Sequence, residues 1–162
     1  MTVRRKKGGY FQPDEGAPAP LVVRLKRRVS FNEADVMGIA WYGRYPVYFE
    51  EGSAELGRHC DLSYQDFAEA NLRAPIVQLH IDYHQPLRLD EEFTIVTSGI
   101  WSEGARLNTE FELICEDGST AATAYSVQML TGSVSGEPCL TTPKILERCR
   151  SRWKAGEFAW LK

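Results

Sequence analysis

The spacing of apolar and polar residues predicts a strand followed by a helix in the first third of the chain. Residues 21–31 alternate, and the apolar side of this segment consists of Val23, Leu25, Val29 and Phe31. Such alternation is typical of a half-buried strand. After residue 44 the spacing changes to three and four, and the resulting stripe consists of Tyr45, Tyr48, Phe49, Gly52 and Leu56. This stripe predicts a helix with one buried face, and Pro46 suits its first turn.

The rest of the chain predicts strands joined by turns. Alternating or β-rich runs cover residues 76–85, 93–101, 106–115 and 120–130. Asp117-Gly118 is the kind of pair favoured at tight hairpins. Ser63 followed by Asp66 predicts a short capped helix through about Leu72, and residues 143–153 predict a terminal helix. Because only one helix is long and well patterned, we expect an α+β fold. A first strand and a four-stranded antiparallel meander would form a sheet wrapped around that helix.

Length and composition indicate a single globular domain. A chain of 162 residues is large enough to bury its own core. Residues 1–20 are rich in glycine and proline and are expected to form a flexible leader, with the domain over residues 21–162. The formal net charge of −3 gives no general affinity for nucleic acid or an anionic membrane. The basic run at residues 4–7 is therefore interpreted as a solvated arm.

Targeting signals and metal sites are not evident in the sequence. No apolar run approaches the roughly 18 residues of a membrane span, and no hydrophobic segment follows the basic residues as in a secretory signal. We therefore expect a cytoplasmic protein. The cysteines are widely spaced without a C-x-x-C unit, and they are Cys60, Cys115, Cys139 and Cys149. This spacing favours reduced thiols over a zinc site or a disulfide framework, and no cofactor is implied.

Candidate chemistry lies between the first strand and the helix. Two acids, Glu33 and Asp35, precede Gly38. A loop carboxylate can act as general base or nucleophile in hydrolysis. The unpaired N–H groups at a helix start, together with the helix dipole, favour negative charge on a carbonyl oxygen. The alternative is a structural acid, since aspartate is common before glycine turns. Arg27 interrupts the apolar side of the preceding strand, which favours a position near an edge or an interface.

This arrangement resembles the hotdog-fold acyl-CoA thioesterases, in particular the 4-hydroxybenzoyl-CoA thioesterase-like branch. The resemblance covers residues 22–130 and is carried by Asp35-Val-Met-Gly38-Ile-Ala-Trp-Tyr42-Gly-Arg-Tyr45, with support from residues 81–90. It implies that Asp35 is the catalytic carboxylate and that the backbone N–H of Tyr42, next to Gly43, polarises the thioester carbonyl. Some relatives have histidine where this chain has Tyr42.

The resemblance also assigns secondary roles and a partner. Glu50 matches a helix acid of the family, while Trp41 and Tyr45 are candidates for the acyl pocket, with core packing as their alternative. The spacing of Glu33 does not match, so it is interpreted as a solvated bystander. The implied substrate is an acyl-CoA, and the implied assembly is a homodimer or homotetramer. A non-catalytic acyl-CoA-binding or assembly module stays open. A hotdog dehydratase or hydratase would need a histidine downstream of the loop, and none precedes His59.

Overall fold

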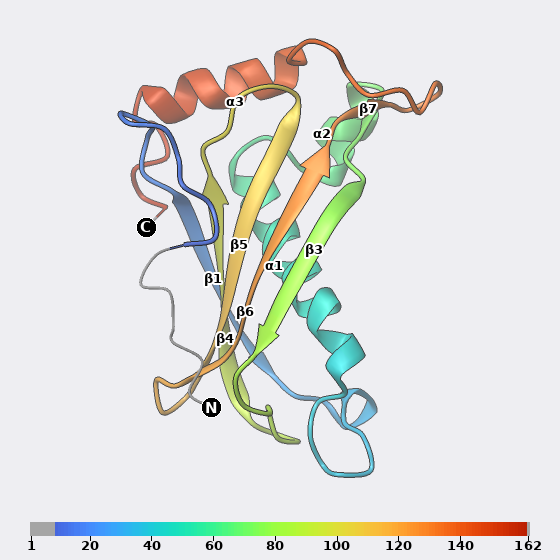
Figure 1. Ribbon diagram of the computed structural model, residues 1–162, viewed down its shortest axis with the longest axis vertical. Helices are drawn as coiled ribbons and strands as arrows, with labels where there is room; N and C mark the ends of the chain where they lie inside the picture. Colours follow the sequence, from blue (N-terminus) through green and yellow to red (C-terminus); the bar gives the residue numbers. More distant parts are fainter. Residues whose placement is uncertain (1–8, 162) are drawn as a thin grey trace.

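A five-stranded antiparallel sheet and one long helix make up most of the structure, a computed structural model that describes residues 9–161 (Figure 1). The strands of the sheet are β1 (Leu21–Arg28), β3 (Ile76–Tyr83), β4 (Glu92–Ile100), β5 (Arg106–Cys115) and β6 (Thr120–Met129). Helix α1 (Tyr45–His59) lies against one face of this sheet. The expected α+β hotdog arrangement, with one long helix on an antiparallel sheet, is confirmed.

Helix α1 begins where its sequence predicts and buries the predicted stripe. Pro46 lies in its first turn, and Tyr45, Tyr48, Phe49 and Gly52 are buried. The sheet residues opposite them include Phe93 and Ile95 of β4 and Phe111 and Leu113 of β5, all buried in the same cluster. Gly52 allows the closest approach, because a Cβ there would lie 2.0 Å from Oγ1 of Thr97 on β4. Gly52 therefore has a packing reason that offsets its low helix propensity.

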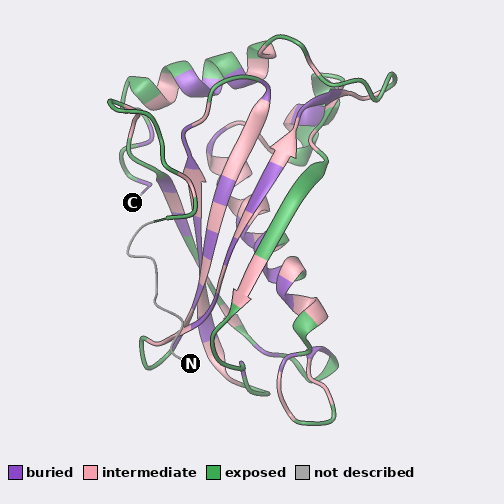
Figure 2. Cartoon of the chain, viewed as in Figure 1, coloured by how far each residue is buried: buried purple, intermediate pink, exposed green. Residues whose placement is uncertain are grey.

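The strand order departs from the expected four-stranded meander. Only β4, β5 and β6 form a meander, and the full order is β1-β4-β5-β6-β3. Strand β3 pairs with β6, with Ile81 opposite Ala124, rather than with β4, which follows it in the chain. The reason is that β1 occupies the edge of β4 that the simple meander would have assigned to β3. Strand β3 thus becomes an edge strand, and Figure 2 shows it largely exposed beside the buried central strands.

The first strand is shorter than expected. Strand β1 ends at Arg28, and the chain then turns into a 3₁₀ helix, Phe31–Glu33. The expectation that Phe31 continues the apolar face is wrong, since its side chain is 86% exposed. Val29 keeps its buried position. The capping box of Ser30 and Glu33 explains the break, because the Glu33 carboxylate accepts the Ser30 N–H and turns the backbone away from the sheet.

The remaining elements close one end of the sheet. Helix α2 (Tyr64–Glu69) begins after the predicted cap Ser63, although it ends before Leu72, and helix α3 (Lys144–Lys154) follows Pro143. A two-residue strand, β2 (Leu72–Arg73), pairs with β7 (Thr131–Gly132). Figure 1 places α3 at the end of the sheet opposite the loop that precedes α1. No helix of the described part is both long and apolar enough to cross a membrane.

The described part of the N-terminal leader lies along the outer face of the sheet. The Tyr10 hydroxyl donates to Oδ2 of Asp82 at 2.5 Å, and the N–H of Phe11 donates to Oε1 of Glu110 at 2.8 Å. The Tyr10 ring also packs on Tyr125, with 5.0 Å between ring centroids. The basic run at residues 4–7 falls outside the described residues. The division of the chain into a leader and a domain after residue 20 stays a prediction.

Candidate active site

Asp35 lies in a tight loop whose backbone is closed by its own hydrogen bonds. The N–H of Asp35 donates to the carbonyl of Ile39 at 2.9 Å, and the N–H of Gly38 donates to the carbonyl of Asp35 at 3.0 Å. Gly38 has a φ of 75°, which glycine adopts without strain. The carboxylate is half-buried, and its Oδ1 accepts the N–H of Met37 at 2.8 Å. Among residues 9–161 no other donor contacts it, so Oδ2 is left for a water or a substrate.

Neighbouring segments hold this loop on both sides. The N–H of Ala40 donates to the carbonyl of Leu87 at 2.7 Å, and the N–H of Leu89 donates to the carbonyl of Gly38 at 2.9 Å. Leu87 is fully buried in the main core. On the other side, the N–H of Trp41 donates to the carbonyl of Glu33 at 2.9 Å. The loop that carries Asp35 is therefore attached to the core directly before α1 begins.

Glu33 is buried, so its interpretation as a solvated acid is wrong. Its carboxylate accepts the Ser30 N–H at 2.8 Å and Nη2 of Arg27 at 2.8 Å. Arg27 also binds Glu51 of α1 at 2.8 and 2.9 Å. Burial alone would raise the pKa of Glu33, but the Ser30 N–H and the Arg27 guanidinium together lower it. Arg27 thus interrupts the apolar face of β1 because it joins that strand to the loop and to α1.

A turn of 3₁₀ helix, Tyr42–Arg44, leads directly into α1. Within the described part of the chain, the backbone N–H of Tyr42 has no hydrogen-bond partner. The indole of Trp41 covers Gly43, because a Cβ on that glycine would lie 2.3 Å from the ring. Trp41 and Tyr42 are themselves exposed, and their ring centroids are 5.2 Å apart. The structure therefore brings Trp41, Tyr42 and Gly43 together at the helix start, next to the Asp35 loop.

Tyr83 belongs to the same region and was not predicted. Its hydroxyl, at the end of β3, donates to the carbonyl of Tyr42 at 2.8 Å. Its ring packs against Tyr45, with 4.8 Å between the centroids. Tyr45 is only 2% exposed, and burial raises the pKa of its hydroxyl. Tyr45 is therefore a core residue that supports the helix start, and Tyr83 connects the edge strand to it.

Glu50 is not grouped with Asp35. It lies two turns after Tyr42, about 12 Å along the helix axis, and is exposed. Its Oε1 accepts the hydroxyl of Tyr64 on α2 at 2.8 Å. Burial and the Glu50 carboxylate raise the pKa of Tyr64 to about 12. A pocket role for Glu50 stays a prediction, because the contact recorded for its carboxylate is with α2.

The three histidines have partners elsewhere. His59 lies 3.0 Å from Oε1 of Glu55 near the end of α1. His80 lies 3.1 Å from Oδ1 of Asp82 on the outer face of the sheet, and His84 lies 2.9 Å from a threonine hydroxyl of β6. Within the described residues none of them contacts the Asp35 loop, and no group of three acidic, histidine or cysteine side chains could hold a metal ion.

Comparison with known proteins identifies the family. Residues 29–149 match the model of the Thioesterase-like superfamily, and the chain belongs to that family. Over 114 residues it is 24% identical to a Synechocystis protein named provisionally as an esterase, with 70% of this chain and 58% of that protein covered. Over 70 residues it is 26% identical to the acyl-CoA thioester hydrolase YbgC of Escherichia coli, with 43% and 52% covered. The chain thus spans little more than half the length of these curated relatives.

Solved structures share the fold at low identity. The DHNA-CoA thioesterase of Staphylococcus aureus superimposes with a TM-score of 0.75 at 18% identity, covering 86% of this chain and 95% of that one. A second protein from Staphylococcus aureus, solved in complex with CoA, has a TM-score of 0.74 at 15% identity, covering 88% and 89%. These similarities establish the hotdog architecture for this chain.

Proposed function

We propose that this protein hydrolyses acyl-CoA thioesters to a free acid and CoA. The observation that carries the proposal is the pairing of a loop carboxylate with an unpartnered backbone N–H. Within residues 9–161, one oxygen of Asp35 has no donor and the N–H of Tyr42, in the 3₁₀ turn that leads into α1, has no acceptor. Family membership and the names of the relatives agree with this chemistry, and a relative in fold binds CoA.

The proposed reaction uses Asp35 as the base. Asp35 accepts a proton from a water molecule, whose oxygen attacks the thioester carbonyl carbon. The carbonyl oxygen becomes negatively charged and accepts the Tyr42 N–H, where the helix dipole adds favourable potential. The C–S bond then breaks, the carbonyl re-forms, and the thiolate of CoA takes the proton from Asp35. An alternative route has Asp35 attack the carbonyl and form a mixed anhydride that water then hydrolyses.

The remaining site residues have supporting roles in this proposal. Trp41 packs over Gly43, and the exposed rings of Trp41 and Tyr42 offer an apolar surface to the acyl group. A dehydratase or hydratase has no support from the side chains around the loop, since the three histidines contact other residues. A non-catalytic acyl-CoA-binding module differs only in lacking turnover.

We further propose that the protein acts as a homodimer or higher homo-oligomer paired through β3. An edge strand presents unpaired backbone groups, and β3 also exposes apolar side chains, namely Ile76, Val77, Leu79 and Tyr83. Pairing two β3 edges would cover this surface and place Tyr83, which binds the Tyr42 carbonyl, at the boundary between subunits. Multi-angle light scattering tests this: a mass near 18.3 kDa, that of one chain, contradicts the proposed assembly.

The function is tested with a panel of acyl-CoA thioesters of different acyl size. Release of the CoA thiol is followed with a chromogenic thiol reagent. We expect saturable, enzyme-dependent release for at least one member of the panel. Saturable binding of acyl-CoA, measured by calorimetry, without any release of thiol would instead establish the non-catalytic binding module.

A further inference from the structure

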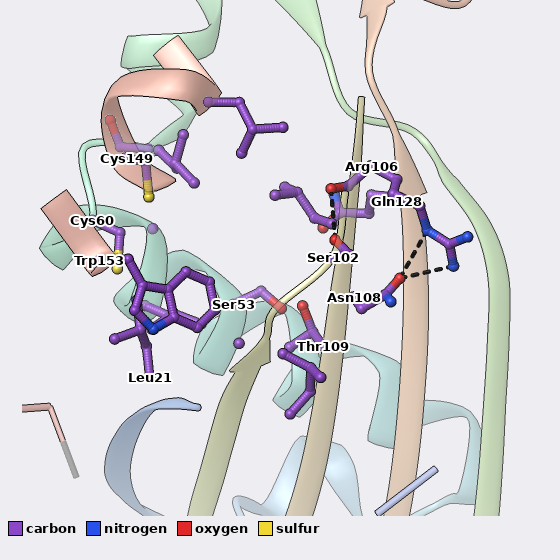
Figure 3. A pocket seen from close by; sticks show the side chains of 18 of the residues that line it. Leu21, Ser53, Cys60, Ser102, Arg106, Asn108, Thr109, Gln128, Cys149 and Trp153 are labelled. Atoms are coloured by element: carbon purple, nitrogen blue, oxygen red, sulfur yellow. Dashed lines mark hydrogen bonds between the residues drawn. The ribbon is translucent and has the colours of Figure 1, made fainter. Parts of the chain in front are cut away.

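A cavity lies at the end of the molecule opposite Asp35, enclosed by the second half of α1, the β4–β5 end of the sheet, and α3 (Figure 3). Its volume is about 110 Å³. An engineered protein cavity of about 150 Å³ is known to hold benzene, so this one, about three quarters of that volume, has room for a short chain. Most of its wall is apolar, and the apolar side chains include Leu56, Phe67, Leu107 and Trp153.

The cavity is separate from the Asp35 loop within this chain. Helix α1 has 15 residues and therefore spans about 22 Å, with the loop before its first residue and the cavity along its last turns. Between them the helix touches the sheet, because a Cβ on Gly52 would lie 2.0 Å from Thr97 and 3.1 Å from Ile95. No room is left there for a ligand to run from one site to the other.

The charged residues of the cavity wall are all of one sign. The wall contains two arginines, Arg106 and Arg150, and neither aspartate nor glutamate. Arg150, on α3, is only 9% exposed. Its Nη2 donates to the backbone carbonyl of Arg106 at 3.2 Å, and its guanidinium carbon lies 5.9 Å from the centre of the Trp101 ring. None of the ion pairs within 4.0 Å among residues 9–161 includes Arg150.

Such a cation is costly in the free protein. A buried charge is normally paired, because neither a single carbonyl nor an aromatic ring replaces its hydration. Burial lowers the pKa of Arg150, and the negative charge of Glu103 offsets only part of this effect. The Glu103 carboxylate accepts the indole N–H of Trp101 at 2.9 Å. The Arg106 guanidinium donates to the neutral amide oxygen of Asn108 at 2.9 and 3.1 Å, so within residues 9–161 neither arginine forms an ion pair with a carboxylate.

We propose that this cavity binds a small monocarboxylic acid, with its apolar body among Leu56, Phe67 and Leu107 and its carboxylate on Arg150. The planar guanidinium matches a carboxylate with two parallel hydrogen bonds. The apolar wall excludes water from the rest of the ligand, and the second arginine adds potential of the same sign. This site goes beyond the proposed hydrolysis and does not depend on it.

The test uses the full chain and two acids, butyrate and benzoate, with 1-butanol and benzyl alcohol as neutral counterparts. Nitrogen-15 NMR follows the indole N–H signals of two tryptophans, since Trp153 lines the cavity and Trp41 lies at the Asp35 loop. We expect at least one acid to shift the Trp153 signal saturably, with a Kd below about 10 mM. The corresponding alcohol should bind at least about tenfold more weakly, because it lacks the charged hydrogen bonds.

Three variants test whether the acid occupies the cavity and binds Arg150. Arg150→Met should weaken binding of the acid at least about tenfold, while Arg148→Met, on the exposed side of the same helix, should leave it unchanged. Ala54→Leu fills the cavity from α1 and should abolish the Trp153 shift. If Arg150→Met does not fold, the comparison of acid with alcohol and the Ala54→Leu variant carry the same test.

Several results would overturn the proposal. The acid and its alcohol could bind with equal affinity, or the acid could bind Arg150→Met or Ala54→Leu as tightly as the wild type. Both acids could also fail to bind saturably with a Kd below about 10 mM; each of these results contradicts the proposed site. A shift confined to the Trp41 signal would also overturn it, because the acid would then occupy the Asp35 loop rather than the cavity.

Discussion

Replacing Glu33 by glutamine tests how the candidate active-site loop is attached to the core. The Glu33 carboxylate makes two charge-assisted hydrogen bonds, from the Ser30 N–H and from Arg27, each at 2.8 Å. Glutamine keeps an oxygen for the Ser30 N–H, and Arg27 keeps its contacts with Glu51. The substitution therefore removes about one charged hydrogen bond at a side chain that is only 7% exposed. We expect the free energy of unfolding to fall by about 2 kcal/mol.

The loss should depend on pH with a defined sign. The pKa of Glu33 is lower in the folded protein than its ordinary value of 4.5, so its charge stabilises the fold. That contribution is fully present above pH 4.5 and disappears as the pH falls below 4.5 and through the lowered pKa. The difference between the wild type and Glu33→Gln should therefore be largest near neutral pH and shrink in acid.

Thermal and urea unfolding followed by circular dichroism measure this effect. A loss of about 2 kcal/mol corresponds to a lower Tm of roughly 4–8 °C for a chain of this size. Glu50→Gln is the matched control, because Glu50 is exposed and, among the described residues, its carboxylate is hydrogen-bonded only to the exposed Tyr64. Its variant should stay within about 0.5 kcal/mol of wild type. Equal stability of Glu33→Gln and wild type at pH 7, or a difference that persists unchanged in acid, would refute the reasoning.

Three further substitutions test the packing around the site. Gly52→Ala should lower the Tm and destabilise the fold by about 1–3 kcal/mol in urea unfolding, since its Cβ would lie 2.0 Å from Thr97; unchanged stability would contradict this close contact. Tyr83→Phe removes the 2.8 Å hydrogen bond to the Tyr42 carbonyl and should lower the free energy of unfolding by about 1 kcal/mol. An unchanged free energy of unfolding would contradict a contribution from that bond. Leu87→Ala should cost about 2–5 kcal/mol by the same assay, because Leu87 is fully buried, and a cost under about 1 kcal/mol would contradict that burial.

The sequence predicted those parts of the fold that depend on local patterns. Tyr45, Tyr48, Phe49 and Gly52 recur at helical spacing, and that spacing alone places the helix and its buried face. Pro46 marks its first turn for an equally local reason. The pairing of β3 with β6 could not be predicted in this way, because strand partners distant in the chain are chosen by tertiary packing and the simplest expectation joins neighbours.

Local sequence patterns also predicted part of the candidate site. The order of Asp35, Gly38 and Tyr42 is local, so the loop and the helix start were found from sequence. The burial of Glu33 was missed, because it depends on Arg27 from β1 and on the surrounding structure. The capping pair of Ser30 and Glu33, spaced three residues apart, was the available signal for it.

Two more features had no sequence signal. Tyr83 reaches the helix start only because β3 runs along the edge of the sheet. The cavity beside Arg150 is formed by segments from both ends of the chain, including Leu21 and Trp153. In both cases the residues involved are far apart in the sequence, so no local pattern predicts that they come together.

The rate of thiol release by the Asp35→Asn variant tests the central claim most directly. The substitution keeps an oxygen that can accept the Met37 N–H, so the loop should keep its shape and the circular dichroism spectrum and Tm should match wild type. With the acyl-CoA that the wild type hydrolyses best, we expect kcat to fall by about 10²–10⁴-fold, the usual contribution of a catalytic base. Turnover close to that of wild type would contradict the assignment of Asp35 as the catalytic carboxylate.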